Sequence, residues 1–255
     1  MPVVLIEKQS SQVTVLTLNR PDRRNALTVE LMTELTVAIE AASADATQRV
    51  LILRGAGPAF CAGLDMNETA LPEKAHESGG MVARTLLALS QTRLITIAAV
   101  HGAAVAGGAG IMSACDFVVA AEGTKIGYPE VKRGLVAGLV MTFLRRQLHE
   151  RDARELLFAA ELIDAGRARE MGLVNRVVSP GDLESEVQKI AAAVLQGAPG
   201  ALANSKRLLE QLWPVSVKED IERALAHHMH ARESHEAREG VAAFLEKRAP
   251  AWAPQ

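Results

Sequence analysis

Two glycine-rich segments, each placed directly after an apolar run, constrain this chain more than any other feature. The first, residues 59–66, reads Ala-Phe-Cys-Ala-Gly-Leu-Asp-Met and follows the strand-like run 50–54. The second, residues 101–110, reads His-Gly-Ala-Ala-Val-Ala-Gly-Gly-Ala-Gly and follows the run 95–100. A sharp turn and a helix start both leave backbone N–H groups without an internal acceptor. We therefore interpret the two segments as a clasp that holds one developing oxyanion between two backbone amides.

The apolar pattern predicts alternating strands and helices over the first two-thirds of the chain and helices afterwards. Residues 67–80 are polar and interrupted by proline and glycine, which predicts a mobile loop that covers the site. A turn near Pro199 divides an α/β core, residues 1–198, from a helical part, residues 199–255. Amphipathic helices beyond the needs of one core often bury their apolar faces against other subunits, so we expect an oligomer.

Composition excludes several classes of function. The formal net charge is −2 and aromatic residues make up 3%, which argues against a nucleic-acid partner. The chain begins with a strand-like segment that lacks a signal-peptide core, and no apolar run approaches the ~18 residues of a membrane span. Cys61 and Cys115 stand in apolar surroundings without a metal-ligand pattern. We expect a cytoplasmic protein without a membrane partner.

Two features of the sequence suggest a cofactor and are better explained otherwise. His227, His228, His230 and His235 gather on one predicted helix, but no carboxylate stands at a zinc-ligand spacing. We interpret them as a solvent-exposed helix face and predict no metal site. The residues around Gly107 do not form a G-x-G-x-x-G run, so a dinucleotide site is not expected either.

The two glycine segments, in this order, resemble those of the enoyl-CoA hydratase/isomerase (crotonase) superfamily. The matching phrases are Ala-Phe-Cys-Ala-Gly-Leu-Asp at 59–65, Gly-Gly-Ala-Gly at 107–110 with Ala-Cys-Asp at 114–116, Leu-Asn-Arg-Pro at 18–21, Arg-Asn-Ala-Leu at 24–27, Pro-Glu at 129–130, Ala-Gly-Arg-Ala at 165–168, Met-Gly-Leu-Val at 171–174 and Phe-Leu-Glu-Lys-Arg at 244–248. The resemblance implies an α/β fold, a crotonase-type spiral of repeated ββα units with a C-terminal helical trimerisation region. It also implies a homotrimer or homohexamer and an acyl-CoA substrate, with coenzyme A as part of the substrate and no separate cofactor.

The resemblance further implies a set of site residues. The oxyanion amides fall on Ala62 and Gly107, and the acid/base carboxylate falls on Glu130. A glutamate in an apolar acyl pocket has its charged form disfavoured, which raises its pKa toward values useful for proton transfer. The residues expected to bind the CoA ester are Arg24, Ala26, Leu27, Ala62, Gly63, Leu64, Asp65, Met66 and Lys247.

The chain departs from the family pattern at two acidic positions. The second glutamate of typical hydratases falls on Gly110, and an aspartate of dienoyl-CoA isomerases falls on Gly138. Hydration is best served by two carboxylates, whereas one carboxylate is sufficient to move a proton between C2 and C4 of an enoyl thioester. The sequence leaves hydration and isomerisation open. A non-catalytic acyl-CoA-binding or regulatory protein of the same fold is the alternative, and the presence of Glu130 favours an enzyme.

Overall fold

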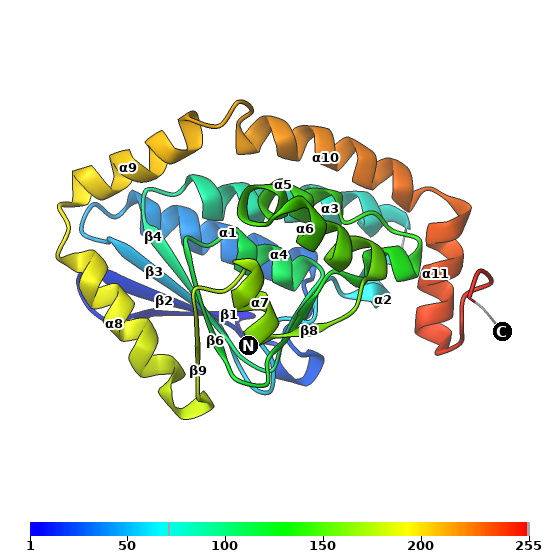
Figure 1. Cartoon of the computed structure of the whole chain (residues 1–255), viewed down its shortest axis with the longest axis horizontal. Helices are drawn as coiled ribbons and strands as arrows, with labels where there is room; N and C mark the ends of the chain where they lie inside the picture. The colour runs from blue at the N-terminus through cyan, green and yellow to red at the C-terminus, as the bar shows by residue number, and fades with distance from the viewer. Residues whose placement is uncertain (71, 254–255) are drawn as a thin grey trace.

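A six-stranded sheet forms the centre of the computed structural model, which describes residues 1–70 and 72–253 (Figure 1). The spatial order of its strands is β1-β2-β3-β4-β6-β9. Only the β1–β2 pair is antiparallel within this sheet, and the other pairs run parallel. The strands are β1 (Val4–Lys8), β2 (Val13–Leu18), β3 (Val50–Gly55), β4 (Ile95–Val100), β6 (Phe117–Ala121) and β9 (Arg176–Val178).

Helices cover both faces of this sheet, which explains why its inner strands are apolar along their whole length. Val15 and Ile52 face helix α8 (Leu183–Leu195), where they pack with Ile190. The alternate residues, including Leu16 and Leu53, pack on the other face with helices α1 (Val29–Ala44) and α3 (Pro72–Gln91). The two glycine segments therefore begin at the ends of strands that helices hold in place on both faces of the sheet.

A second, smaller sheet continues from the ends of the central strands. It contains β5 (Ala103–Val105), β7 (Lys125–Gly127) and β8 (Ile163–Asp164). The remaining short elements are 3-10 turns η1 (Pro21–Arg23), η2 (Pro129–Arg133) and η4 (Pro180–Asp182), helices α2 (Met66–Thr69), α4 (Gly107–Ser113), α5 (Gly138–Gln147), α6 (Glu150–Arg154) and α7 (Ala165–Met171), and the π-helical turn η3 (Glu155–Ala159).

The three C-terminal helices extend around the core. Helices α9 (Pro199–Gln211) and α10 (Val217–Arg232) run across the top of Figure 1, and α11 (His235–Glu246) descends at its right side. Helix α10 packs against α3 and α5, and α11 packs against η2. Helix α9 leaves Leu208, Leu209 and Leu212 exposed. The C-terminal part therefore contributes to the core structure, in addition to the oligomer contacts that we expect from its apolar surface.

The segment predicted as an irregular loop, residues 67–80, is mostly helical. Helix α2 occupies its start, and α3 begins at Pro72, so the prediction of an irregular loop is wrong here. Leu71 lies outside the described residues. Gly79 lies where helix α3 packs against helix α10. A Cβ there would lie 2.7 Å from Met229 Sδ, so glycine allows α3 to approach α10 closely. This tertiary contact outweighs the low helix propensity that suggested a loop.

Candidate active site

The first glycine segment forms a turn beyond β3 that is held by Leu27. The Leu27 N–H donates to Gly63 O over 2.8 Å, and the Asp65 N–H donates to Leu27 O over 2.9 Å. Between these bonds lies the Leu64 N–H, for which the described part of the chain provides no acceptor. Gly63 has φ of +93°, and a Cβ there would meet a backbone oxygen of β5 at 2.9 Å. Glycine is therefore required for the turn that leaves the Leu64 amide free.

The second glycine segment places another amide beside the first. Ala106 precedes helix α4 with φ of +51° and ψ of −124°, a strained conformation for a residue with a Cβ. Its N–H donates to Gly127 O over 2.8 Å, which helps to hold this conformation. Gly107 follows as the first helical residue, where an N–H has no intrahelical acceptor. A Cβ on Gly107 would lie 3.9 Å from Leu64 N, so two available amides lie close together.

In the first glycine segment, the N–H without an acceptor among the described residues belongs to Leu64 and not to Ala62, the residue that we predicted. The Ala62 N–H donates to Arg24 O over 2.9 Å, so it is not available to a ligand. The available N–H of this turn is therefore that of Leu64 and not that of Ala62, while the donor role of Gly107 stays a prediction. Ala62 still lines the cavity. The sequence marks the turn, but the direction of each N–H depends on pairing with a distant segment.

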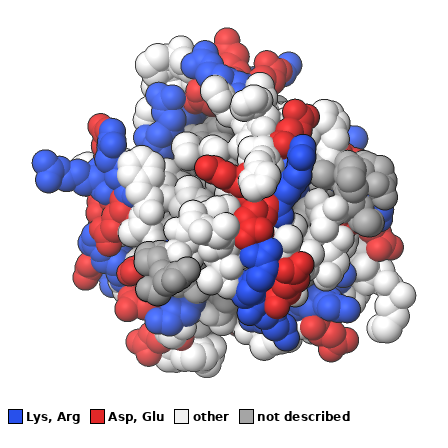
Figure 2. Space-filling model, turned by 90° about the vertical axis from the view of Figure 1, so that its right-hand side faces the viewer, with Lys and Arg blue, Asp and Glu red and all other residues white. Residues whose placement is uncertain are grey.

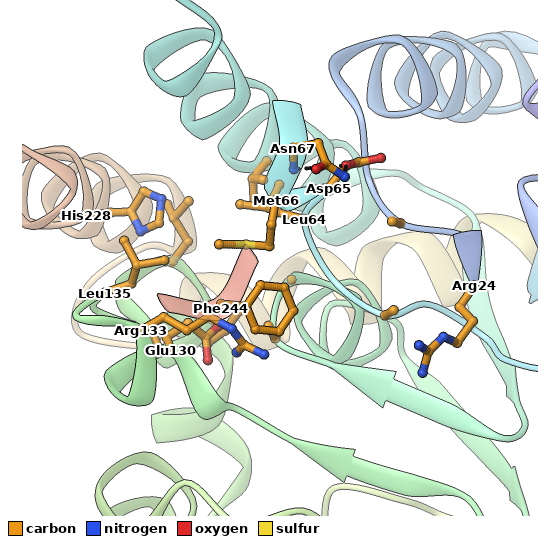
Figure 3. A pocket seen from close by; sticks show the side chains of 18 of the residues that line it. Arg24, Leu64, Asp65, Met66, Asn67, Glu130, Arg133, Leu135, His228 and Phe244 are labelled. Carbon is orange, nitrogen blue, oxygen red and sulfur yellow. Dashed lines mark hydrogen bonds between the residues drawn. The ribbon is translucent and has the colours of Figure 1, made fainter. Parts of the chain in front are cut away.

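Glu130 lies in the wall of the same cavity, which has a volume of about 310 Å³. It is part of η2, and its side chain is seen close to Arg133 in Figure 3. The residue is 9% exposed, and its Oε2 has no hydrogen-bond partner among the described residues. Burial raises the pKa of the Glu130 carboxyl to about 7, although its own backbone and the Arg133 charge act in the opposite direction. The carboxyl is thus able to exchange a proton near neutral pH.

Helix α11 holds the turn that carries Glu130. A Cβ on Gly240 would lie 2.4 Å from Arg133 O, so the helix backbone lies directly against η2. The Arg133 guanidinium stacks on the Phe244 ring at 4.4 Å. Arg133 and Phe244 both line the cavity. The C-terminal helices are therefore part of the wall of the site, a role that the sequence did not reveal.

The positions where the family pattern has a second acid are filled by neighbouring side chains and backbone. A Cβ on Gly110 would lie 2.5 Å from Val140 Cγ1, and one on Gly138 would lie 2.9 Å from Ala224 O. Val140 lines the cavity near these positions. Within the described residues of this wall, Glu130 is the carboxylate that combines burial with a raised pKa.

The other predicted binding residues are divided between the cavity and its surroundings. Those in the wall are Arg24, Ala26, Ala62, Leu64, Asp65 and Met66. Leu27 and Gly63 stand behind the wall, where they shape the turn, and Lys247 is an exposed residue at the end of α11. On the face that carries α11, Figure 2 shows basic and acidic side chains interspersed around a mostly uncharged centre.

His228 is a cavity residue that we expected on a solvent-exposed helix face. Its ring lines the cavity and is 7% exposed, whereas His227 and His230 are exposed as predicted. The four histidines look alike in sequence, and the packing of α10 on α3 and α5 selects one for burial. In the described ranges no group of three His, Cys, Asp or Glu side chains is arranged to hold a metal. Nor does any helix in these ranges have the length and apolar character to span a membrane.

Comparison with known proteins assigns the chain to a family. The family model described as enoyl-CoA hydratase/isomerase matches residues 8–255. The chain belongs to this family. A relative from Thermus thermophilus, whose name places it among the enoyl-CoA hydratases, is 38% identical over 96% of this chain and 99% of its own. The crotonyl-CoA hydratase of Syntrophomonas wolfei is 34% identical over 96% of this chain and 95% of its own.

Solved structures confirm the fold class. A crystal structure of an enoyl-CoA hydratase from Mycobacterium avium has a TM-score of 0.87 and 33% identity, and covers 99% of this chain and 100% of that one. Another, from Mycobacterium avium subsp. paratuberculosis, has a TM-score of 0.88 and 26% identity, with 99% of each chain covered. The predicted α/β crotonase fold and superfamily are therefore confirmed.

We predict that Gly110→Ala lowers the free energy of unfolding by about 1–3 kcal/mol, because its Cβ overlaps Val140. Val140→Ala in the same chain should recover part of this loss, which a double-mutant cycle measured by urea unfolding will quantify. Gly80→Ala is the matched control, since no atom of the described residues lies within 4 Å of a Cβ at that helical position. Independent, additive effects of the Gly110 and Val140 substitutions would contradict the overlap.

We predict that Glu130→Gln gains stability relative to the unmodified chain as the pH rises from about 4.5 to 7. The folded-state pKa of about 7 exceeds the ordinary value of 4.5, so in this window the folded chain holds a proton that the unfolded chain has lost. Stability conferred by that proton falls with rising pH, by at most ~3 kcal/mol. Thermal unfolding of both proteins at several pH values tests this, with the exposed Glu222→Gln as control. Parallel pH profiles would show that Glu130 titrates normally.

Proposed function

We propose that this protein processes enoyl-CoA thioesters through an enolate intermediate. The observation that carries the proposal is the combination, in one cavity, of two close amides without an acceptor and one buried carboxyl without a partner. The amides suit the thioester oxygen, where negative charge develops, and the carboxyl suits the proton on the neighbouring carbon. The names of the relatives, which include a crotonyl-CoA hydratase, support a CoA ester as substrate.

The proposed chemistry assigns one role to each group. The Leu64 and Gly107 N–H groups donate to the thioester oxygen and stabilise the enolate. The Glu130 carboxylate removes a proton from C2, which gives a conjugated enolate when the substrate has a double bond between C3 and C4. The carboxylic acid so formed returns the proton to C4 and leaves the double bond between C2 and C3. A pKa of about 7 suits both halves of this cycle.

We propose that the CoA part of the substrate binds at the exposed end of the cavity. Arg23 and Arg24 line it there, both are exposed, and neither has an ion pair among the described residues. Arg20 and Arg248 are less suited to phosphate, because Arg20 bonds to Asp65 at 3.0 Å and Arg248 bonds to Glu239 at 2.6 Å. Lys247 is exposed and is proposed as a further partner of a CoA phosphate.

We also propose that the protein forms a homotrimer or homohexamer. The exposed leucines at the end of α9 support this proposal.

Isomerisation is the reaction that the single acid favours, and hydration is the second candidate. Val140 occupies the space beside Gly110 where a second carboxylate would stand to orient water. Hydration is favoured by the names of the relatives, one of which is a mevalonyl-coenzyme A hydratase from Aspergillus fumigatus that is 32% identical. Liquid chromatography with mass spectrometry of products from 2-enoyl-CoA and 3-enoyl-CoA substrates distinguishes them. Hydration adds the mass of water, whereas isomerisation keeps the mass and changes the retention time, because the double bond has moved.

We predict that Glu130→Gln removes nearly all turnover and leaves CoA-ester binding almost unchanged. Glutamine keeps the size of the side chain but cannot accept the proton from C2. In the unmodified protein, kcat/KM should rise with pH through about 7, as Glu130 becomes the charged base. Steady-state kinetics and calorimetric binding provide the two measurements. Binding without turnover by the unmodified protein would instead favour the non-catalytic acyl-CoA-binding alternative.

We predict that replacing the Leu64 amide by an ester lowers kcat by about 10²–10³, the effect of losing one oxyanion donor. Incorporation of the α-hydroxy analogue of leucine removes the N–H and keeps the side chain. The same replacement at Ala62 is the control, because its N–H bonds to Arg24 O, and it should affect stability more than kcat. Full turnover with the Leu64 ester, or a comparable loss with the Ala62 ester, would contradict the assignment.

A further inference from the structure

His228 is a buried polar side chain that the proposed reaction does not use. Its Nδ1 lies 3.1 Å from Val136 O, and a carbonyl oxygen only accepts, so Nδ1 carries the hydrogen. The lone pair of the neutral ring then lies on Nε2, which is buried and has no hydrogen-bond partner among the described residues. Burial, helped by the Arg232 charge, lowers the pKa of His228 to about 4, so the ring is neutral at physiological pH. His228 therefore offers one hydrogen-bond acceptor.

The surroundings of His228 place this acceptor at the acyl end of the cavity. In Figure 3, His228 and Arg24 lie at opposite sides of the view, with Glu130 between them. In the same view Leu135 lies beside His228, and Leu139 and Val140 also line the cavity. Since Arg24 is at the end proposed for CoA, a bound acyl chain would extend from Glu130 toward His228.

The acceptor requires a specific kind of partner. A buried polar atom without a hydrogen bond is unfavourable by about 1–3 kcal/mol, so a ligand that satisfies it gains affinity. A carboxylate has no hydrogen to donate, and a plain alkyl chain leaves the acceptor unpaired. A single water needs two to four polar partners, and Leu135, the labelled neighbour of His228 in Figure 3, supplies none. A hydroxyl group on the ligand donates one hydrogen bond and matches the single acceptor.

We propose that the acyl group of the natural substrate carries a hydroxyl that donates a hydrogen bond to His228 Nε2. This inference rests on the proposed function, because it takes the cavity as an acyl-CoA site. His228 is then a specificity-determining residue, with Glu130 and the two amides performing the reaction. A site built to pair a substrate hydroxyl discriminates strongly against the analogue that lacks it, because the buried acceptor is left alone.

The test measures binding by calorimetry, so it does not depend on turnover. The ligands are saturated acyl-CoAs of four to eight carbons and their counterparts with a hydroxyl on the third or the terminal carbon. His228→Asn keeps an N–H near the position of Nδ1 for Val136 O and removes the acceptor at Nε2. His228→Gln places an amide oxygen near the position of Nε2. His227→Leu changes the adjacent, exposed histidine of α10 and serves as the control.

We expect at least one hydroxylated ligand to bind the unmodified protein about tenfold more tightly than its saturated parent, the equivalent of one hydrogen bond. This preference should disappear in His228→Asn, persist in part in His228→Gln and remain unchanged in His227→Leu. Thermal unfolding checks that each variant is folded. A folded Gln variant supports the comparison even if the Asn variant does not fold.

Three outcomes overturn the inference. A preference that survives in His228→Asn, or no preference with any ligand, shows that His228 does not recognise a hydroxyl. No binding of any acyl-CoA by the unmodified protein contradicts the proposed function itself, and the inference with it.

Discussion

The site depends on direct contact between backbone segments that are far apart in the sequence. The Cys61 N–H donates to Ala103 O over 3.0 Å, and the Val105 N–H donates to Cys61 O over 3.0 Å. A Cβ on Gly108 would lie 2.4 Å from Cys61 O and 2.8 Å from Cys61 Sγ, so α4 lies directly against Cys61 and has no room for a side chain at Gly108. Because backbone atoms set this spacing, the two available amides are held in place before any ligand binds. Such preorganisation is what makes hydrogen bonds effective on a developing charge.

Asn25 connects the turn at the first glycine segment to the rest of the core. Its side chain is fully buried, and its Nδ2 donates to Ala59 O over 2.8 Å and to Ala56 O over 2.9 Å. Its Oδ1 accepts from the Arg20 N–H over 2.8 Å. One amide side chain thus satisfies backbone groups on both sides of the turn, which would otherwise be buried without partners. The position of the Leu64 amide follows from this network as well as from the glycines.

The sequence predicted the features that depend on local pattern, and missed those that depend on contact between distant segments. Apolar runs and glycines located β3, β4 and the start of α4, and the family motifs gave the crotonase fold. The Leu64 donor was missed because the direction of its N–H is set by pairing with Leu27. The helix through Gly79 was missed because its stability comes from the packing of α3 on α10. His228 was missed for the same reason, since its neighbours on α10 show no difference in pattern.

The lack of a carboxylate at Gly110 and the raised pKa of Glu130 have a common physical origin. Val140 fills the space at Gly110, and together with Leu139 it makes this part of the cavity wall aliphatic. An aliphatic wall withholds water from Glu130, and this desolvation is the main cause of its raised pKa. A carboxylate in place of Val140 would bring a like charge and its hydration water into the same space. The packing that leaves no room for an acid at Gly110 therefore also contributes to the raised pKa of Glu130.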